Sequence, residues 1–242
     1  MVFFYWPHWR KCANDLRFAN LLLSLAPTLR IYYNEPGAGD SMKAILFDFD
    51  GVLTPDKYGS DSILRYLGDN SDVPFEVLKR EYYKINKGLL CGQYTHKDIW
   101  EEYCNRVGTY IDFQILIDSF INTPLDSDML AVVKQLKDKY LIGMITDNKI
   151  DRIETILNYN GLNDLFDVVT VSAQCKCGKD ERKIFDITIQ ALNVEAGECI
   201  FIDNSEKNLI VPNEMGMHTV LFDDEKRDLI GLKNELSKLL RY

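Results

Sequence analysis

The chain has 242 residues, of which 46% are hydrophobic and 27% are charged, a composition typical of a globular enzyme with a sizeable core. Its formal net charge of −9 argues against a nucleic-acid-binding protein, because binding to a phosphate backbone requires clusters of Lys and Arg. A small anionic substrate is still allowed, since a local cation can dominate a site whatever the overall charge.

Six cysteines are scattered along the chain: Cys12, Cys91, Cys104, Cys175, Cys177 and Cys199. In a chain of this length, scattered cysteines are typical of reduced thiols rather than of a disulfide framework, so we expect a cytoplasmic location. Cys175 and Cys177 form a Cys-Lys-Cys pair, but no second pair completes a tetrahedral zinc site.

Residues 1–41 differ from the rest of the chain because they combine clustered aromatic residues with a leucine run at 21–25. The apolar part is too short to span a bilayer. The segment is also a poor signal peptide, because no basic residue precedes its first aromatic residues and no clear small-residue cleavage site follows Leu25. Residues 11–25 could form an amphipathic helix at a surface or membrane interface. The simpler interpretation is an extension of uncertain role, with the working domain beginning at Met42.

Residues 43–54 contain an apolar run, 44–47, that is typical of a buried parallel strand. Asp48 and Asp50 follow it, and residues i and i+2 of a strand lie on the same side, so we expect the two carboxylates close together. Gly51 permits a sharp turn there. Two close carboxylates are suited to a divalent cation or a shared proton. The alternative is an ordinary strand end followed by an Asp- and Gly-rich turn.

Residues 56–126 show a helical pattern in which strands are hard to find. Apolar residues recur at helical spacing between 73 and 88, and Gly88 is suited to end that helix. Thr95 opens a segment that resembles a capping box, and a third helix is expected over 112–122. An insertion directly after the first strand is where a lid would lie. The alternative is an ordinary helical subdomain without contact with the site.

From residue 126 onward, helices and strands alternate. Helices are expected over 128–139, 149–160, 181–192, 206–215 and 227–240, and strands over 141–146, 167–171, 199–203 and 218–222. This alternation predicts an α/β fold, a doubly wound parallel sheet with helices on both faces and right-handed crossovers. Ligands of such sheets bind beyond the carboxyl ends of the strands, near a switch in strand order.

Three of the expected strands end in residues suited to phosphoryl transfer. Asp48 and Asp50 end the first strand, Thr146 ends the second and Asp203 ends the fourth, while Lys179 precedes a helix between the third and fourth. A carboxylate can attack a phosphoryl group and form an aspartyl phosphate, while magnesium offsets the negative charge. A hydroxyl and an ammonium can hold the transferring group. Each residue alone has a simpler explanation, such as a helix cap for Asp203.

Four segments together resemble the haloacid dehalogenase-like hydrolase superfamily, over residues 43–223. The segment at 48–54, DFDGVLT, is similar to the first motif of that family and is a specific signal. The segments at 144–148 (MITDN), 179–185 (KDERKIF) and 201–208 (FIDNSEKN) are similar to the second, third and fourth motifs.

The resemblance implies roles for five residues. Asp48 would be the nucleophile, and Asp50 would protonate the leaving group and then act as the base for water. Thr146 and Lys179 would hold the phosphoryl group. Mg²⁺ would be bound by the carboxylates of Asp48 and Asp203 and by the backbone carbonyl of Asp50.

The resemblance also predicts the domain organisation. Residues 42–55 and 127–242 would form a Rossmann-like phosphatase core, and residues 56–126 would form the small helical cap that closes over the substrate in this family. Residues 1–41 would lie outside both.

The chain departs from the family pattern at three positions. Asn204 stands where the fourth motif often has a second acid, which calls into question one outer contact of the metal. Asp147 stands where many relatives have asparagine and would add negative charge near the phosphate site unless it points away. Asp180 follows Lys179 where proline is common. Lys179 is preferred over nearby Lys176 because its spacing to the phenylalanine of the third motif fits.

Asp50 favours ester hydrolysis over dehalogenation, because an alcohol or sugar oxygen needs a general acid and a halide does not. We therefore predict a Mg²⁺-dependent phosphoric monoester hydrolase acting on a small phosphorylated metabolite, without nucleic acid and without a membrane span. Residues 92–100 look similar to cap segments of sugar-phosphate phosphatases, which points to a sugar phosphate.

Two alternatives stay open: a phosphomutase of the same superfamily, and a non-catalytic binding protein with the same fold. A nicotinamide-binding protein is disfavoured, because no Gly-x-Gly-x-x-Gly run follows the first strand. The sequence does not indicate the oligomeric state.

Overall fold

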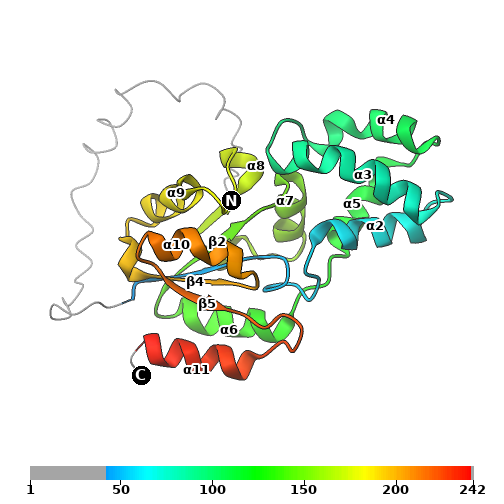
Figure 1. Cartoon of the computed structure of the whole chain (residues 1–242). Helices are drawn as coiled ribbons and strands as arrows, with labels where there is room; N and C mark the ends of the chain where they lie inside the picture. The colour runs from blue at the N-terminus through cyan, green and yellow to red at the C-terminus, as the bar shows by residue number, and fades with distance from the viewer. Residues whose placement is uncertain (1–41, 241–242) are drawn as a thin grey trace, which may run out of the picture. The chain divides into compact units, whose positions relative to one another are not determined.

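The structure is a computed structural model that describes residues 42–240. The extension at 1–41 and the helix expected over 11–25 lie outside the described residues. The described part of the chain is an α/β fold with a block of helices inserted after the first strand (Figure 1).

Five parallel strands form one sheet in the order β3-β2-β1-β4-β5. They are β1 (Ala44–Phe47), β2 (Leu141–Thr146), β3 (Val168–Val171), β4 (Cys199–Asp203) and β5 (His218–Leu221). The chain moves outward from β1 first through β2 and β3 and then through β4 and β5. The strand order therefore switches at β1, and the carboxyl end of β1 is where a ligand is expected. The predicted doubly wound parallel sheet is confirmed.

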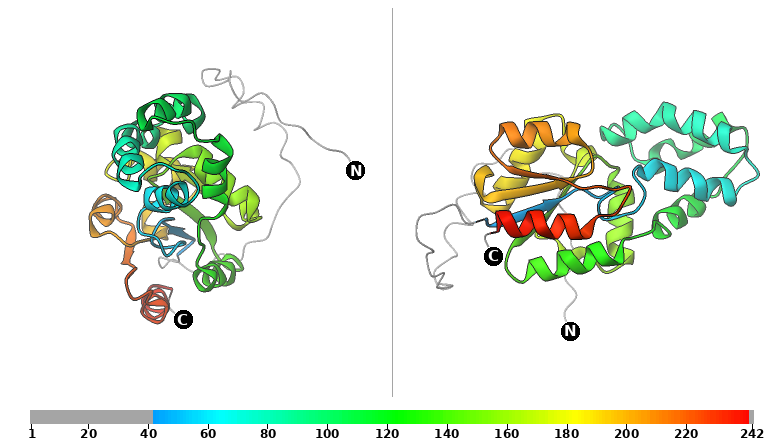
Figure 2. Two further views of the ribbon diagram at one scale, coloured as in Figure 1. Left: turned by 90° about the vertical axis from the view of Figure 1, so that its right-hand side faces the viewer. Right: turned by 60° about the horizontal axis from the view of Figure 1, so that its bottom comes forward.

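Helices cover both faces of the sheet. They are α6 (Ser127–Lys137), α7 (Ile150–Tyr159), α8 (Ser172–Cys175), α9 (Arg182–Leu192), α10 (Ile210–Glu214) and α11 (Leu229–Leu239), with short 3-10 turns η1 (Asn163–Leu165), η2 (Ala196–Glu198) and η3 (Glu206–Leu209). Figures 1 and 2 show α9 and α10 on one face and α6 and α11 on the other. Alternate residues of β1 divide accordingly: Leu46 packs in the cluster that contains α9, and Phe47 in the cluster that contains α6 and α11.

The inserted block consists of α2 (Gly59–Asp69), α3 (Phe75–Leu90), α4 (His96–Val107) and α5 (Phe113–Ile121), with no strand between residues 56 and 126. Helix α5 packs against α2 of the block and against α7 of the sheet layer. Thr95 begins α4 with a capping box, because its side chain accepts from the backbone of Asp98 while Asp98 accepts from the backbone of Thr95.

The prediction that Gly88 ends a helix was wrong. Helix α3 continues through Gly88 to Leu90, and the positive φ of 63° occurs at Gly92 instead. A Cβ at position 88 would lie 2.2 Å from the hydroxyl oxygen of Tyr94, which donates to the carbonyl of Ile85 at 3.1 Å. The glycine therefore permits close packing of an aromatic ring against the helix, rather than a turn.

The helix expected over 206–215 is divided into η3 and α10. Pro212 lies in this segment and has no N–H to donate to the carbonyl of Asn208. A continuous α-helix would need that hydrogen bond. The proline is accommodated in the first turn of α10, where the N–H has no partner in a helix.

Arg227 holds together the two connections of the helical block. Its guanidinium donates to the carbonyls of Gly51 (2.5 Å) and Val52 (2.8 Å), next to the chain's entry into the block. It also donates to the carboxylate of Asp126 (3.0 Å), at the chain's exit. The backbone N–H of Asp126 donates to the carbonyl of Leu53 at 2.9 Å. The entry and the exit are thereby fixed side by side at the end of β1.

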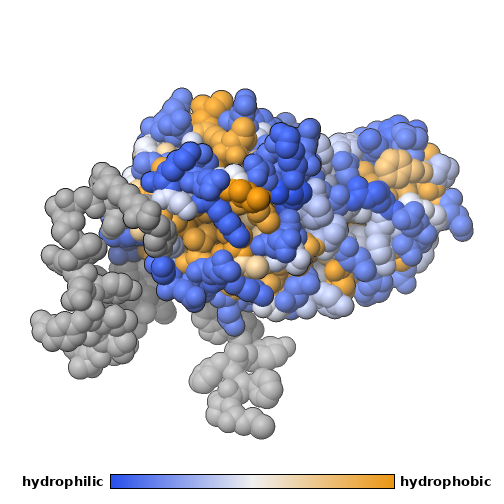
Figure 3. All heavy atoms as spheres, turned by 90° about the horizontal axis from the view of Figure 1, so that it is seen from below, coloured by the Kyte–Doolittle hydropathy of each residue, from blue (hydrophilic) through white to orange (hydrophobic). Residues whose placement is uncertain are grey.

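One face of the described part of the chain is largely hydrophilic (Figure 3). Figure 3 shows one face on which hydrophilic residues predominate, interrupted by apolar patches over the sheet layer and over the helical block. Within residues 42–240, each helix is too short or too polar to cross a membrane.

Candidate active site

The turn after β1 brings two aspartates to the end of the sheet. The backbone N–H of Asp48 still donates to the carbonyl of Ile202 in β4, at 2.9 Å, so Asp48 keeps its place beside that strand. Gly51 then adopts a φ of 85°, and a Cβ there would lie 2.2 Å from the side-chain nitrogen of Asn204. Both observations require glycine at position 51. The turn is closed by Thr54, whose hydroxyl accepts from the N–H of Gly51 at 3.2 Å.

Lys179 lies between the carboxylates of Asp48 and Asp203. Its Nζ is 2.7 Å from Oδ1 of Asp48 and 2.6 Å from Oδ2 of Asp203, and all three side chains are buried. Burial alone would lower the pKa of Lys179, but the Asp48 and Asp203 carboxylates raise it above its usual value. The lysine is therefore held charged between the two carboxyl groups. Lys176, the alternative candidate, is exposed and lies after α8.

Asp48 itself is held in an environment that opposes its ionisation. Burial, followed by the nearby Asp203 and Asp50 carboxylates, raises its pKa to about 8, against the opposing effect of Lys179. The backbone N–H of Phe49 donates to Oδ1 of Asp48 at 2.7 Å. A carboxylate with this surplus of negative charge around it is suited to a cation.

Asp203 ends β4 and is fully buried. Its Oδ1 accepts from the backbone N–H of Ser205 at 2.8 Å, and the side-chain nitrogen of Asn208 donates to both carboxylate oxygens at 3.1 and 3.2 Å. Asn208 was not among the residues given a role from the sequence, although it closes the fourth motif. It orients Asp203 toward Lys179.

Thr146 ends β2, and its hydroxyl accepts from Nδ2 of Asn148 at 3.3 Å. Asp147, next in the chain, is exposed, and its carboxylate accepts from the backbone N–H of Lys179 at 3.0 Å. The acid at position 147 thus fastens the loop that carries Lys179. This contact accounts for the departure noted at position 147, and the carboxylate also lines the cavity described below.

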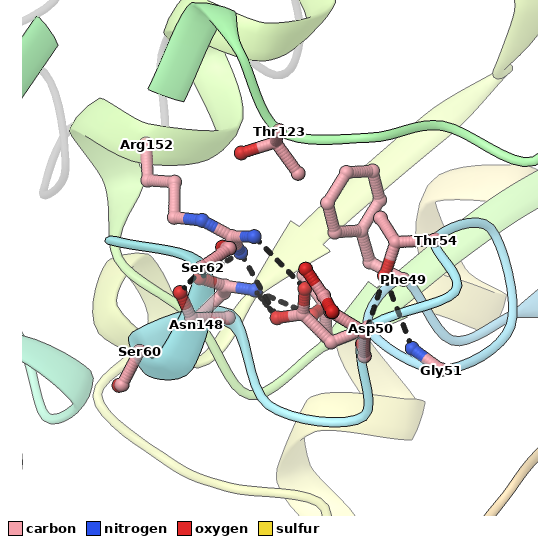
Figure 4. A network of polar contacts seen from close by, with 12 residues as sticks. Phe49, Asp50, Gly51, Thr54, Ser60, Ser62, Thr123, Asn148 and Arg152 are labelled. Carbon is pink, nitrogen blue, oxygen red and sulfur yellow. Dashed lines mark hydrogen bonds and ion pairs between the residues drawn. The ribbon is translucent and has the colours of Figure 1, made fainter. Parts of the chain in front are cut away.

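The carboxylate of Asp50 faces α7 and is bound by three donors (Figure 4). Arg152 donates from Nη1 to Oδ2 and from Nη2 to Oδ1, each at 2.9 Å, and Asn148 donates from Nδ2 to Oδ2 at 2.8 Å. Such a two-pronged pair fixes both the position and the plane of a carboxylate. Arg152 was not assigned a role from the sequence, because it lies 102 residues from Asp50 along the chain.

Arg152 has no exposed surface and packs against the ring of Phe49, 5.5 Å from its centroid. A Cβ at Gly59, the first residue of α2, would lie 2.3 Å from Nη1 of Arg152 and 2.5 Å from Oδ2 of Asp50. Because Gly59 has no side chain, the backbone of α2 can pack directly against the Arg152–Asp50 pair.

The position where the family pattern often has a second acid is occupied by Asn204. Its side-chain nitrogen donates to Asp224 at 3.0 Å, and Asp224 also pairs with Lys57 at 3.5 Å. The loop after β5 therefore places a carboxylate, that of Asp224, in contact with Asn204, although the fourth motif itself lacks the second acid.

A cavity of about 320 Å³ joins these residues to the helical block. Asp48, Asp50, Thr146 and Lys179 line it from the strand ends, whereas Asp203 is fully buried behind Lys179. From the block it is lined by residues that include Ser60, Tyr83 and Asn86, and Lys149 at the start of α7 also lines it. The structure thus brings the five residues selected from the sequence to one end of the sheet.

A family model described as haloacid dehalogenase-like hydrolase matches residues 42–216 of the chain. β-Phosphoglucomutase of Bacillus subtilis (strain 168) is 24% identical over 191 residues, which cover 74% of this chain and 82% of the relative. A phosphatase of Mycobacterium tuberculosis is 22% identical over 211 residues, covering 82% of this chain and 95% of the relative.

Acyl-CoA dehydrogenase family member 10 of Mus musculus is 23% identical over 199 residues, which cover 76% of this chain. The matched region makes up only 18% of the mouse protein, so most of that protein has no counterpart here.

Two solved structures illustrate the similarity of fold. An enzyme of Bacteroides thetaiotaomicron, in complex with magnesium and inorganic phosphate, has a TM-score of 0.66 at 19% identity and covers 79% of this chain and 99% of its own. A protein of Porphyromonas gingivalis described as a predicted hydrolase has a TM-score of 0.66 at 18% identity and covers 81% of this chain and 98% of its own. Both are described as members of the same family.

Proposed function

Because the chain belongs to the haloacid dehalogenase-like hydrolases, we propose that it is a Mg²⁺-dependent phosphoric monoester hydrolase that forms an aspartyl phosphate on Asp48. The observation that carries this proposal is the arrangement of Asp48, Lys179 and Asp203 at the ends of β1 and β4, beside a cavity that the helical block completes. The proposed substrate is a small phosphorylated metabolite, since the cavity has a volume of only about 320 Å³.

In the first step, a carboxylate oxygen of Asp48 attacks phosphorus and the bond from phosphorus to the ester oxygen breaks. The leaving oxygen takes a proton from Asp50. Thr146 and Lys179, which line the same cavity, hold the other phosphoryl oxygens. In the second step, Asp50 takes a proton from water, which attacks the aspartyl phosphate and releases inorganic phosphate.

The donor set fits Mg²⁺. Asp48 and Asp203 supply two carboxylates and Asp50 a backbone carbonyl, and Mg²⁺ is usually bound by one or two carboxylates together with water and substrate oxygens. When bound, the ion would offset the charge between the nucleophile and the phosphoryl group.

Asp50 needs a defined orientation to reach the leaving oxygen. Arg152 and Asn148 supply it, because together they bind both oxygens of the carboxylate from one side. We infer that Arg152 is a positioning residue, which acts on the substrate only through Asp50. The general acid distinguishes the proposed ester hydrolysis from dehalogenation, whose leaving group needs no proton.

The helical block, residues 56–126, is the proposed cap. It contributes Ser60, Tyr83 and Asn86 to the cavity, and Arg227 joins its two connections. Substrate choice would therefore depend on residues that face the cavity from α2 and α3. A sugar phosphate is the substrate type that the similarity of residues 92–100 to sugar-phosphate phosphatases favours.

A phosphomutase is the second candidate, and one observation favours it: β-phosphoglucomutase is among the relatives. A mutase would use the same aspartyl phosphate but return the phosphoryl group to a sugar rather than to water. Conversion of glucose 1-phosphate to glucose 6-phosphate, without release of phosphate, would identify it.

The test of the main proposal is phosphate release from p-nitrophenyl phosphate and from a panel of sugar phosphates, with Mg²⁺ and with a chelator. We expect release that requires Mg²⁺ and that disappears in Asp48→Asn. Release that persists unchanged in Asp48→Asn would contradict the proposed nucleophile, and absence of release from a folded protein would contradict the hydrolase.

A further inference from the structure

Lys149 is a second buried lysine in the cavity, and it lies on the side of the helical block. It is 3% exposed, directly precedes α7, and lines the cavity together with Asp48 and Lys179. Its Nζ donates to the hydroxyl of Ser60 on α2 at 2.8 Å and lies 5.8 Å from the ring centroid of Tyr82 on α3.

Unlike Lys179, Lys149 has no carboxylate within ion-pairing distance among residues 42–240. Burial, and then the positive charge of Arg152, lower its pKa to about 7, although Asp50, Asp151 and Asp61 act in the opposite direction. A buried ammonium without a counter-ion is unfavourable for folding. Its position in a cavity wall suggests that the missing anion comes from a ligand.

The neighbours of Lys149 are arranged to bind polar atoms. The hydroxyl of Ser60 accepts from Lys149 and donates to Oδ1 of Asn86 at 3.2 Å, and all three residues line the cavity. The side-chain nitrogen of Asn86 donates to no acceptor within the described part of the chain, so one more donor is available beside the ammonium. An ammonium and an amide N–H on one wall match the oxygens of an anion.

We propose that Lys149, Ser60 and Asn86 form a subsite for a second anionic group, a carboxylate or a phosphate, on the organic part of the substrate. This inference rests on the proposed function, because it assigns the transferred phosphoryl group to the Asp48 end of the cavity. It narrows the substrate class to phosphate esters that carry two anionic groups.

The test compares three esters of similar size that differ in charge at the far end: 2-phosphoglycolate, 2-hydroxyethyl phosphate and 2-aminoethyl phosphate. Ethanediol bisphosphate serves as a fourth ester and separates phosphate from carboxylate as the second anion. For each ester, kcat and KM are measured for the parent protein and for variants. The variant is compared with the parent on the same ester, so the intrinsic reactivity of that ester cancels from the ratio of the two kcat/KM values.

In Lys149→Met we expect kcat/KM for 2-phosphoglycolate or for the bisphosphate to fall roughly tenfold to a hundredfold, mainly through KM, as for loss of a charge-assisted hydrogen bond. The values for 2-hydroxyethyl phosphate and p-nitrophenyl phosphate should change less than threefold. Lys149→Arg should show a smaller fall in kcat/KM for the esters with a second anionic group, because it keeps a positive charge. The ester with the larger loss identifies the second anion.

Lys57→Met is the matched control, because Lys57 lines the same cavity but its side chain is 46% exposed and paired with Asp224. Lys57→Met should lower kcat/KM for the esters with a second anionic group much less than Lys149→Met does. Equal losses of kcat/KM on all four esters in Lys149→Met, or no loss on either ester with a second anionic group, would overturn the subsite, while p-nitrophenyl phosphate hydrolysis would still support the hydrolase. Failure of the parent to hydrolyse any ester would overturn both proposals.

Discussion

The two halves of the cavity hold their buried charges in opposite ways. At the strand ends, Lys179 lies between two carboxylates, which raise its pKa. At the helical block, Lys149 is equally buried, but within residues 42–240 its ammonium bonds only to a hydroxyl, and its pKa falls to about 7. Among residues 42–240, Lys179 thus has two carboxylate partners, whereas Lys149 has none. The comparison suggests that the strand ends supply chemistry common to the family, whereas the block recognises the particular substrate.

The largest effect is expected from Lys179→Met, which removes the positive charge from the strand-end half. Asp48 and Asp203 would then face each other without a cation, and loss of one partner of a buried ion pair costs about 3–5 kcal/mol. Urea denaturation at neutral pH in the presence of a chelator measures this loss. Mg²⁺ should restore part of this stability, because Asp48 and Asp203 are the carboxylates that would hold the ion and its charge would offset theirs.

The exposed Lys176 offers a matched control for that experiment. Lys176→Met should change the free energy of unfolding by less than about 0.5 kcal/mol. Equal losses of unfolding free energy in the two variants would contradict the claim that buried Lys179 stabilises the protein by its ion pairs and exposed Lys176 does not.

Arg152→Met should separate proton transfer from the rest of the chemistry. Without Arg152, Asn148 is the one side-chain donor that Asp50 keeps in the described part of the chain. General acid catalysis contributes roughly a hundredfold or more for a poor leaving group. We therefore expect kcat for an alkyl phosphate to fall about a hundredfold, and kcat for p-nitrophenyl phosphate, whose leaving group is far less basic, to fall much less.

A purely structural role of Arg152 would reduce the rates for both esters by the same factor. Arg152→Lys should also fail to restore the alkyl phosphatase rate, since an ammonium cannot make the two-pronged contact with Asp50.

The depressed pKa of Lys149 makes folding stability depend on pH. In the unfolded chain this lysine keeps its proton up to about pH 10.5, whereas in the folded protein it loses the proton near pH 7. Between these values the unfolded state binds more protons, so this group makes the free energy of unfolding rise with pH, by at most about 1.4 kcal/mol per unit. Below pH 7 both states are protonated and this contribution no longer changes.

The check is a series of urea denaturations from pH 7 to pH 9.5 on the parent and on Lys149→Met. The difference in unfolding free energy between the two proteins should shift steadily over this range in favour of the parent. A difference that stays constant would mean that the folded protein holds Lys149 in its ordinary charged form.

The smallest effect concerns packing within the helical block. Gly88→Ala places a methyl group against the hydroxyl of Tyr94 and should destabilise the protein by about 1–2 kcal/mol. Gly68→Ala in α2 meets its nearest atom only at 3.4 Å and should be neutral or stabilising by up to about 1 kcal/mol, as alanine favours a helix. Thermal unfolding of the two variants distinguishes them, and equal shifts would contradict the account of Gly88.

Much of the fold was predictable because its signals are local. The apolar runs of β1, β2 and β4 end where the polar residues begin, and the structure has those strands at the expected bounds. Helix α3 continues beyond Gly88, and the glycine makes room for Tyr94, a contact that the periodicity of the helix does not report. The helix expected over 206–215 is divided near Pro212. The proline was a local signal for this division, but the prediction followed the hydrophobic pattern instead.

The candidate site was predictable where a short motif supplies it, as at Asp48 and Asp50. Arg152 was not, because its partner lies far away in the chain and arginine in the first turns of a helix is usually solvated. Lys149 was treated only as the start of a helix. Lys149 is buried because α2 and α3 pack against it. The second motif, residues 144–148, carries no information about these distant helices.

The central claim, a covalent intermediate on Asp48, is tested most directly by quenching the reaction in acid during turnover and analysing the peptides by mass spectrometry. We expect the peptide that contains Asp48 to carry one phosphoryl group, to lose it with hydroxylamine, and to remain unmodified in Asp48→Asn. A phosphoryl group on another residue, or rapid turnover in which the Asp48 peptide never becomes modified and Asp48→Asn stays active, would contradict the account.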